Sequence, residues 1–397
     1  MNGLIATKIK LEKSEFIPYG HQDITEKDIE AVVKVLQSDF LTQGPAVTAF
    51  EQKLCSYTGA KYSIAVNSCT SALHIACLAL DLGPGDILWT SPISFVASAN
   101  CAIYCGATID FVDIEVDTAL MSVEELTKKL EFAEKEGKLP KIVIPVHFAG
   151  QPCDMKEIHA LGQKYGFKII EDAAHAIGSK YKNKPIGSCQ YSDITVFSFH
   201  PVKIITTGEG GAVMTNSLFL AERIELLRSH GITRDPDKMH RRSCDSWYYE
   251  QVSIGFNYRM TDIQAALGLS QLNRLDKYVS QRSDISKWYD EQFRNTTFDS
   301  LIQKPNRESS YHLYIVSIRD GKQTRDKIFN GLRENGIGVN LHYIPIYKHP
   351  FFNMNTHLEN TEYYYDRAIT IPIYPTIDKK SLYKIVDNIL LFKGAGK

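Results

Sequence analysis

Short runs of β-branched and other apolar residues alternate with longer helical patterns between residues 62 and 170 of this 397-residue chain. The expected strands cover residues 62–66, 87–90, 108–112, 141–146 and 168–170, and the expected helices between them cover residues 70–80, 94–104, 123–136 and 155–165. A helix between two strands carries the chain back to the end of the sheet where the first strand began. The next strand then runs in the same direction, so the two strands pair in parallel. The alternation therefore predicts an α/β fold in which helices cover both faces of a mostly parallel sheet.

Other patterns flank this region. A helix is expected over residues 25–38, where Thr25 and Asp28 have the spacing of a capping box. A second helix, over residues 218–229, leads into a polar, aromatic and basic segment at 234–251 that we expect to be a long loop.

The C-terminal third predicts a smaller unit of its own. A helical pattern runs from about residue 261 towards 293, and it is followed by an expected strand at 311–318, a helix at 324–335, a strand at 339–343 and terminal helices. We therefore expect a large domain with an N-terminal arm over residues 1–260, and a linking helix with a small C-terminal α/β domain over residues 261–397.

Composition and charge exclude several classes of protein. The formal net charge of -1 provides no field to attract nucleic acid or an anionic membrane surface. The N-terminus has no apolar core of signal-peptide length, and no later apolar run could span a bilayer, so a cytoplasmic location is expected. The eight cysteines form no CxxC pair, and no cluster of histidines and carboxylates has the spacing of a metal site. Reduced thiols and no bound metal are expected.

Two strand ends carry groups that suit a ligand with a phosphate and a ring. The segment 64–73 reads as a strand, a turn of small residues and the start of a helix, whose free N–H groups can bind phosphate. A plain helix cap by Ser68 or Thr70 is the alternative. Phe95 follows another strand and could stack on a ring or pack in the core.

Asp172 comes at the carboxyl end of a buried strand, which is where open α/β sheets bind their ligands. A carboxylate there could bind a metal, cap a helix or hold a proton on a heterocyclic nitrogen. The small residues Ala173 and Ala174 beside it suit a flat ring better than a metal shell.

Lys203 lies between an apolar, β-rich stretch and a glycine-rich turn that ends at Gly211. A lysine amine in a packed, partly dry pocket loses its proton readily and can condense with an aldehyde. Taken alone, such a lysine is more often a surface residue. Together, a phosphate-binding turn, a platform at Phe95, a carboxylate at Asp172 and a reactive amine are the parts of a pyridoxal phosphate (PLP) site.

Motifs along nearly the whole chain carry a family resemblance. They are Leu41 to Pro45, the turn at 67–73, Glu171 to Ala176, Phe197 to Gly211, Gly255 to Ala266 and His342 to Tyr347. On these motifs the chain resembles the DegT/DnrJ/EryC1/StrS family of PLP-dependent sugar aminotransferases. The resemblance implies a large domain with the fold type I, aspartate aminotransferase-like architecture. It also implies a homodimer whose subunits share active sites.

The resemblance assigns roles by position. Lys203 would form the Schiff base with PLP and carry the proton, and Asp172 would hold the pyridine nitrogen. Further contacts to PLP are expected from Cys69, Thr70, Phe95, His175 and Ser198, and from Asn257 of the partner subunit. Cys69 stands where the family usually has glycine, which need not impair binding because backbone N–H groups meet the phosphate there. His175 stands where glutamine is common, so the polar contact at that edge of the ring is left open.

For a nucleotide sugar, the resemblance points to Tyr19, Asp39, Phe40, Leu41, Thr42, Leu341, His342, Tyr343 and Ile344. The runs Trp247 to Gln251 and Tyr363 to Tyr365 resemble one subgroup of the family. That subgroup transfers the amino group of L-glutamate to C4 of a UDP-4-keto-6-deoxy-N-acetylhexosamine in pseudaminic acid biosynthesis. Cations for the UDP diphosphate could come from Lys238, Arg241 or Arg242, although a solvated loop face is an equal alternative for these residues.

Other functions compete with this one. A dehydratase of the same family would carry histidine in place of Lys203. A PLP-binding regulator would add a DNA-binding module, and no basic helix-turn-helix extension is visible. A transaminase for another sugar, such as a UDP-L-4-ketopentose or a GDP-4-keto-6-deoxymannose, would share every catalytic residue and stays open.

Overall fold

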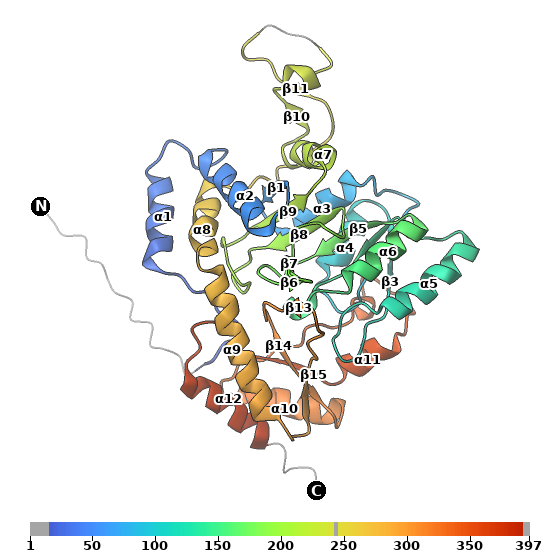
Figure 1. The fold of residues 1–397 in the computed structure, drawn as a ribbon, viewed down its shortest axis with the longest axis vertical. Helices are drawn as coiled ribbons and strands as arrows, with labels where there is room; N and C mark the ends of the chain where they lie inside the picture. Colours follow the sequence, from blue (N-terminus) through green and yellow to red (C-terminus); the bar gives the residue numbers. More distant parts are fainter. Residues whose placement is uncertain (1–15, 242–244, 392–397) are drawn as a thin grey trace, which may run out of the picture.

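The computed structural model describes residues 16–241 and 245–391, and its centre is a seven-stranded sheet (Figure 1). The strands lie in the order β1-β9-β8-β5-β4-β2-β3. Their bounds are Tyr62–Val66 (β1), Gly211–Thr215 (β9), Ile194–Ser198 (β8), Lys168–Asp172 (β5), Ile142–Ile144 (β4), Ile87–Thr90 (β2) and Thr108–Phe111 (β3). Only β9 runs antiparallel to its neighbours, β1 and β8. The predicted α/β fold with a mostly parallel sheet is confirmed.

Helices cover both faces of this sheet. One apolar core packs α3 (Cys69–Ala79), α4 (Ala97–Tyr104) and α7 (Leu218–Arg228) against strand residues such as Ile142 and Ile144. The opposite core packs α2 (Pro45–Thr58), α5 (Val123–Glu136) and α6 (Met155–Tyr165) against others such as Val143. Successive strand residues point to opposite faces, so a strand buried on both sides reads as a continuous apolar run.

The C-terminal part forms a smaller layered unit. A three-stranded antiparallel sheet, β12-β14-β15, packs with helices α10 and α12. The bounds are Phe298–Ser300 (β12), Tyr314–Ile318 (β14), Ala368–Ile371 (β15), Lys322–Glu334 (α10), Glu359–Tyr365 (α11) and Lys379–Leu391 (α12). The strand predicted at 339–343 is wrong. This segment makes only an isolated bridge from Asn340 to Thr370, because β15, which the sequence reading missed, pairs with β14 instead.

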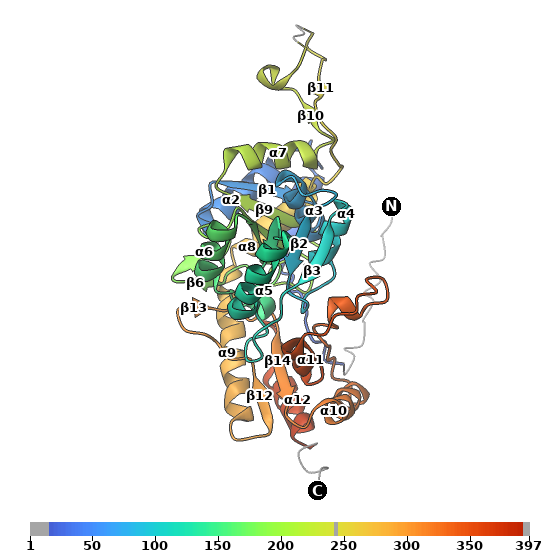
Figure 2. The same cartoon turned by 90° about the vertical axis from the view of Figure 1, so that its right-hand side faces the viewer.

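The helical pattern from residue 261 is two helices, α8 (Asp262–Leu272) and α9 (Leu275–Phe293). α8 packs against α1 (Glu26–Leu36) and α2, so the N-terminal half of the expected linking region lies on the large body. α9 extends down to the small sheet and contacts β12 (Figures 1 and 2). The division of the chain at residue 260 stays a prediction.

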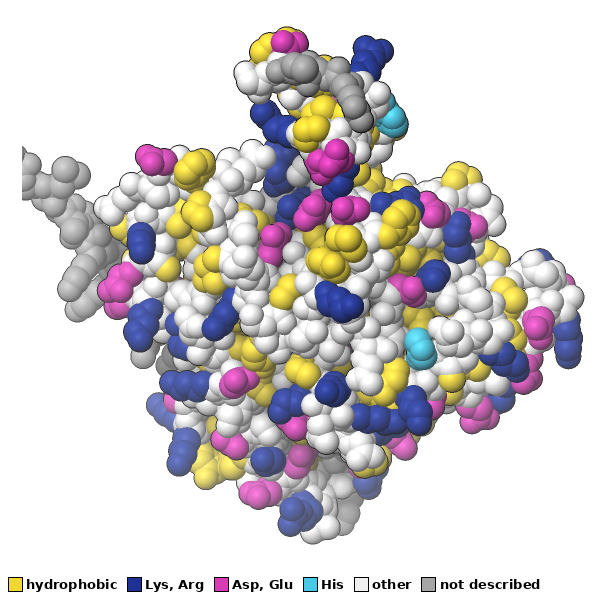
Figure 3. Space-filling model, turned by 45° about the horizontal axis from the view of Figure 1, so that its top comes forward, with side chains coloured by type: hydrophobic (Ala, Val, Ile, Leu, Met, Phe, Trp, Pro, Cys, Tyr) yellow, Lys and Arg dark blue, Asp and Glu magenta, His cyan; other side chains and the backbone are white. Residues whose placement is uncertain are grey.

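A narrow arm stands off from the body above α7 (Figures 1 and 2). In the segment expected to be a long loop, residues 234–241 and 245–249 are mostly irregular. Its last two residues form β11 (Glu250–Gln251), which pairs with β10 (Ile232–Thr233) just before the segment. Figure 3 shows apolar and basic side chains side by side on this arm. Arg242 and Cys244, which figured in the sequence predictions, lie outside the described residues.

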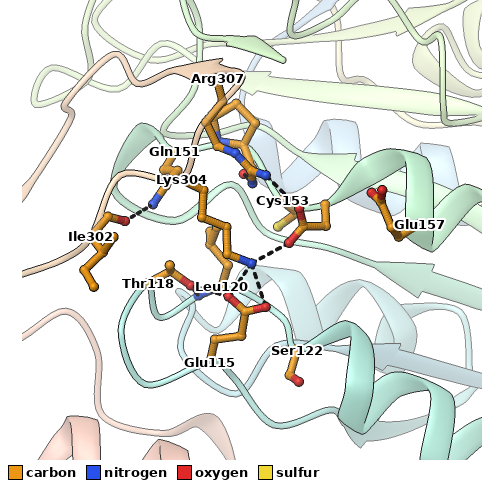
Figure 4. Close-up of polar contacts among 12 residues, drawn as sticks. Glu115, Thr118, Leu120, Ser122, Gln151, Cys153, Glu157, Ile302, Lys304 and Arg307 are labelled. Carbon is orange, nitrogen blue, oxygen red and sulfur yellow. Dashed lines mark hydrogen bonds and ion pairs between the residues drawn. The ribbon is translucent and has the colours of Figure 1, made fainter. Parts of the chain in front are cut away.

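A strap between β12 and β14 ties the small unit to the large body. Lys304 Nζ lies 2.6 Å from both Glu115 Oε2 and Asp154 Oδ2, and Arg307 Nη2 lies 2.6 Å from Asp154 Oδ1 (Figure 4). The strap also forms the edge strand β13 (Arg307–Glu308), which pairs with β6 (Lys180–Tyr181), and β6 pairs in turn with β7 (Lys184–Pro185). Ion pairs that share a partner in a half-buried network contribute more to holding a segment in place than isolated surface pairs do.

None of the helices in the described part of the chain is both long and apolar enough to cross a lipid bilayer. The expected cytoplasmic location stays a prediction.

One buried carboxylate organises two helix starts. Asp262 opens α8 and accepts the N–H groups of Gly44 (2.7 Å) and Ala46 (2.9 Å) at the start of α2. Gly44 is the N-cap of α2 and has no side chain of its own to accept these hydrogens; a Cβ there would lie 2.8 Å from Asp262 Oδ1. The carboxylate of α8 therefore acts as the missing cap of α2.

We expect Asp262→Ala to lower the free energy of unfolding by about 1–3 kcal/mol, because two N–H groups lose a charged acceptor. Urea denaturation followed by far-UV circular dichroism measures the change. Asp262→Asn, which keeps one acceptor oxygen, is the matched control and should cost less. Equal stability of wild type and Asp262→Ala would show that α2 needs no cap from α8.

Candidate active site

Lys203 lies in the turn that follows β8, where its backbone N–H donates to His200 O (2.9 Å). The side chain is half-buried, and burial lowers the pKa of its amine to about 8, although nearby Cys69 and Asp172 favour the charged form. An amine with this pKa is partly neutral near pH 7, unlike an exposed lysine. The structure thus brings together the lysine, the carboxylate and the turn that the sequence singled out.

Asp172 is the last residue of β5 and is only 4% exposed. Its Oδ1 accepts the N–H of Ala174 (3.0 Å), and its Oδ2 accepts the hydroxyl of Ser98 (2.6 Å). Ser98 Oγ lies a further 2.7 Å from Ser94 Oγ. The sequence reading missed both serines. Their spacing of four residues just past a strand end was the only signal that pointed to them.

The start of α3 offers two backbone donors. Its N-cap, Ser68, accepts the N–H of Ser71 through its hydroxyl (3.1 Å) and that of Ala72 through its carbonyl (3.1 Å). The N–H groups of Cys69 and Thr70 are left without an acceptor among the described residues. Free N–H groups at a helix start are the groups that bind phosphate.

Two neighbouring strands pass close to this turn. Gly211 at the start of β9 passes so close that a Cβ would lie 2.7 Å from Cys69 N. Ser198, at the end of β8, pairs with Gly211 in the sheet and so lies beside the same turn. Lysine, carboxylate and phosphate-binding N–H groups are therefore all present, and the residues of the site fit PLP. Among the described residues, no group of three or more His, Cys, Asp or Glu could hold a metal ion.

His175 donates a hydrogen bond to Tyr343 in this structure. The N–H of Ala149 donates to His175 Nδ1 (3.3 Å), and burial together with the charge of Lys203 holds the pKa of His175 well below its usual range. A neutral imidazole whose Nδ1 accepts must carry its hydrogen on Nε2. Nε2 lies 3.2 Å from the Tyr343 hydroxyl, so that hydroxyl accepts from His175 and keeps its own hydrogen for another partner.

The rest of the pocket wall comes from distant parts of the chain. Phe95 is 60% exposed, and its ring centre lies 6.4 Å from that of Tyr343. Tyr19 packs against His342, with ring centres 5.3 Å apart, and burial lowers the pKa of His342 to about 3. Leu341 and Ile344 flank His342 and Tyr343 in the sequence; Leu341 is half-buried and Ile344 is exposed.

His312 is a residue that the sequence reading did not single out. It is buried, its Nδ1 has no hydrogen-bond partner among the described residues, and its ring centre lies 4.4 Å from that of His175. Burial lowers its pKa well below the usual range, so it adds no charge to the pocket. Nothing in its local sequence distinguishes it from an ordinary strand-flanking histidine.

The remaining predicted site residues form no hydrogen bond or ion pair with Lys203 in the described part of the chain, and bond to other segments of it instead. Residues 39–42 are exposed between α1 and α2, and Leu41 O accepts the N–H of Asp262 (3.0 Å). Asn257 is exposed, and its carbonyl accepts from Asn67 Nδ2 (3.4 Å). In the arm, the Lys238 amine forms an ion pair with Glu222 (2.9 Å). Arg241 is exposed, and its backbone N–H donates a hydrogen bond to the Glu250 carboxylate (3.2 Å).

Comparison with known proteins identifies the family. The family model described as the DegT/DnrJ/EryC1/StrS aminotransferase family matches residues 22–390. The UDP-4-amino-4,6-dideoxy-N-acetyl-beta-L-altrosamine transaminase of Campylobacter jejuni is 37% identical over 94% of this chain and 96% of its own length.

Solved structures agree with this match. PseC of Helicobacter pylori, an aminotransferase of pseudaminic acid biosynthesis, superposes with a TM-score of 0.89 at 32% identity, covering 96% of this chain and 100% of the other. The PLP form of Spr1654 from Streptococcus pneumoniae gives a TM-score of 0.85 at 30% identity, with 96% and 99% covered. The chain therefore belongs to the DegT/DnrJ/EryC1/StrS aminotransferase family, as a PLP-dependent aminotransferase of nucleotide sugars.

Proposed function

We propose that this enzyme transfers the amino group of L-glutamate to C4 of UDP-2-acetamido-2,6-dideoxy-β-L-arabino-hex-4-ulose. The product would be UDP-4-amino-4,6-dideoxy-N-acetyl-β-L-altrosamine, an intermediate of pseudaminic acid biosynthesis. The observation that carries the proposal is the near full-length similarity to two proteins whose names state this reaction or pathway, combined with a site that holds Lys203, Asp172 and a phosphate-binding turn together.

In this proposal the cofactor is held by groups from one edge of the sheet. Its phosphate binds the free N–H groups of Cys69 and Thr70, with Ser198 beside them. Asp172 meets the pyridine nitrogen, and Phe95 and His175 flank the ring. When bound, PLP supplies an electron sink that stabilises a carbanion on the amino donor.

Lys203 acts as the proton carrier. Its amine is half-buried and its pKa is about 8, so it can both take a proton from the donor carbon and return one to the product. A base works best when its pKa lies near the working pH, because enough of it is then in the neutral form. Glutamate and the keto sugar would react in turn, which gives ping-pong kinetics.

The nucleotide sugar would lie between Tyr19, residues 39–42 and residues 341–344. Tyr343 is the best placed of these, because its hydroxyl hydrogen is free for a ligand while His175 fixes its oxygen. Burial also raises the pKa of Tyr343 well above its usual range, so it stays a donor. We propose that it binds an oxygen of the sugar.

A homodimer with shared sites would let exposed residues such as Asn257 of one subunit contribute to the pocket of the other. Exposed apolar side chains mark two surfaces that a partner could cover. They are the outer face of α1, with Ile29, Val33 and Leu36, and the arm, with Trp247 at 71% and Ile254 at 79% exposure. In the dimer, Asn257 of the partner subunit would reach the PLP phosphate, and the partner's Arg241 would meet the UDP diphosphate.

Another nucleotide 4-keto sugar is the main alternative substrate. A UDP-L-4-ketopentose or a GDP-4-keto-6-deoxymannose would use the same lysine, carboxylate and phosphate turn. Only the residues around the sugar and the base would distinguish them.

The first test is a panel of UDP- and GDP-4-keto sugars incubated with PLP-loaded enzyme and L-glutamate, with amino-sugar products identified by mass and NMR. We expect C4 amination of the UDP-N-acetyl-6-deoxy sugar. Lys203→Ala, the control, should reduce turnover at least about 1,000-fold, because the proton carrier is lost. Amination of GDP sugars alone would contradict the proposed substrate but leave the aminotransferase intact.

The lowered pKa of Lys203 makes a separate prediction for the PLP-free protein. Acetylation by a small amine reagent, followed at the Lys203 peptide by mass spectrometry, should accelerate up to about pH 8 and then level off, because only the neutral amine reacts. Exposed lysines in the same digest serve as internal controls and should keep accelerating to higher pH. If the rate of Lys203 acetylation instead kept rising to a midpoint near pH 10.5, burial would not lower the pKa of this amine.

A further inference from the structure

Two buried serines form a chain of hydrogen bonds that ends on Asp172. Ser94 lies in the turn after β2, and Ser98 lies in the first turn of α4. Ser98 Oγ is 2.6 Å from Asp172 Oδ2, and Ser94 Oγ is 2.7 Å from Ser98 Oγ. Ser98 is 1% exposed and Ser94 is 4% exposed, so water does not compete for these bonds.

Chemistry fixes the direction of this chain. The Ser98 hydroxyl donates to Asp172 Oδ2, which accepts. The Ser98 oxygen can then only accept from Ser94, and Ser94 must be the donor of that pair. A hydrogen bond to a charged group is about twice as strong as one between neutral groups, and a second donor behind it strengthens it further.

The serines are not needed to cap α4. The first N–H groups of that helix bond to backbone carbonyls: Ser98 N to Phe95 O (3.2 Å), and Ala99 N and Asn100 N to Val96 O (3.1 and 2.8 Å). The N-cap, Val96, has no side-chain acceptor, and neither hydroxyl accepts from the helix start among the described residues. The Ser98 hydroxyl is therefore directed at the carboxylate, and the Ser94 hydroxyl is directed at Ser98.

We infer that Ser98, supported by Ser94, is a positioning residue that holds the Asp172 carboxylate in place for the pyridine nitrogen of PLP. The inference rests on the proposed role of Asp172. Ala174 N–H fixes one oxygen (3.0 Å) and Ser98 fixes the other, so the carboxylate cannot rotate about its own axis. Each oxygen keeps a lone pair for one more donor. Without Ser98, one of the two anchors is lost.

The experiment compares Ser98→Ala, Ser94→Ala and Asp172→Asn in the PLP-loaded enzyme. One readout is the rate at which L-glutamate alone discharges the visible band of bound PLP in a single turnover. The second, independent of turnover, is the pH midpoint of that band, which responds to charge beside the pyridine nitrogen. Ser91→Ala is the matched control, because Ser91 is an equally buried serine in the same segment whose Oγ has no hydrogen-bond partner among the described residues.

We expect Ser98→Ala to slow the single turnover about 10-fold or more, as the loss of a hydrogen bond to a charged group does. Its pH midpoint should move in the same direction as in Asp172→Asn but less far. Ser94→Ala should give a smaller effect of the same kind, and Ser91→Ala should leave the midpoint unchanged.

Double variants test whether the serines act through Asp172. Ser98→Ala should add nothing in the Asp172→Asn background, and Ser94→Ala should add nothing in the Ser98→Ala background. Additive losses would overturn the inference, because the serines would then act independently of the carboxylate. If Ser98→Ala fails to fold, Ser94→Ala and its non-additivity with Asp172→Asn carry the test.

The outcomes separate this inference from the proposed function. A wild-type enzyme that responds to glutamate, together with an impaired Asp172→Asn and an unaffected Ser98→Ala, overturns the positioning role alone. An unimpaired Asp172→Asn overturns the inference together with the proposed role of Asp172. A wild-type enzyme that does not respond to any amino donor overturns the proposed function itself.

Discussion

Parallel pairing of β5 with β4 and β8 is the constraint on which the site depends. It places the carboxyl ends of these strands at one edge of the sheet, so Asp172 at the end of β5 and the turn after β8 that carries Lys203 come together. The antiparallel strand β9 then brings Gly211 back past the start of α3. Helices bury both faces of this sheet, which leaves the carboxyl edge of the strands as the place where open α/β sheets bind ligands.

Burial lowers the pKa values of the basic groups around the pocket. His175, His312 and His342 surround Lys203, and burial keeps the pKa of each below the usual range, so the wall is uncharged. The same burial lowers the pKa of Lys203 to about 8. Asp172 keeps its place in this dry setting through donors on both oxygens, from Ala174 and Ser98. One physical cause, desolvation, therefore sets the protonation of the histidines and the lysine together.

The small C-terminal unit completes the pocket because the strap returns across the large body. The ion pairs of Lys304 and Arg307 hold the strap (Figure 4), and Ser310 Oγ donates to His175 O (2.9 Å) a few residues later. His312 therefore lies against His175. Tyr343, further along the chain, also contacts His175. Contacts of this kind join residues more than a hundred positions apart.

Sequence patterns alone predicted the α/β class, five strands of the large sheet and most of its helices, because strand and helix periods are local. They also singled out Lys203, Asp172 and the turn at 67–73 as candidate site residues, because the motifs that contain them are contiguous. Some boundaries were exact, such as those of α5 and α6, whereas the strand expected at 339–343 was wrong, because pairing partners are not encoded locally. Folding alone shows that Ser98 bonds to Asp172 with Ser94 behind it, that His175 donates to Tyr343, and that His312 lies against His175. Each of these depends on a distance between remote elements, and such distances are fixed by packing.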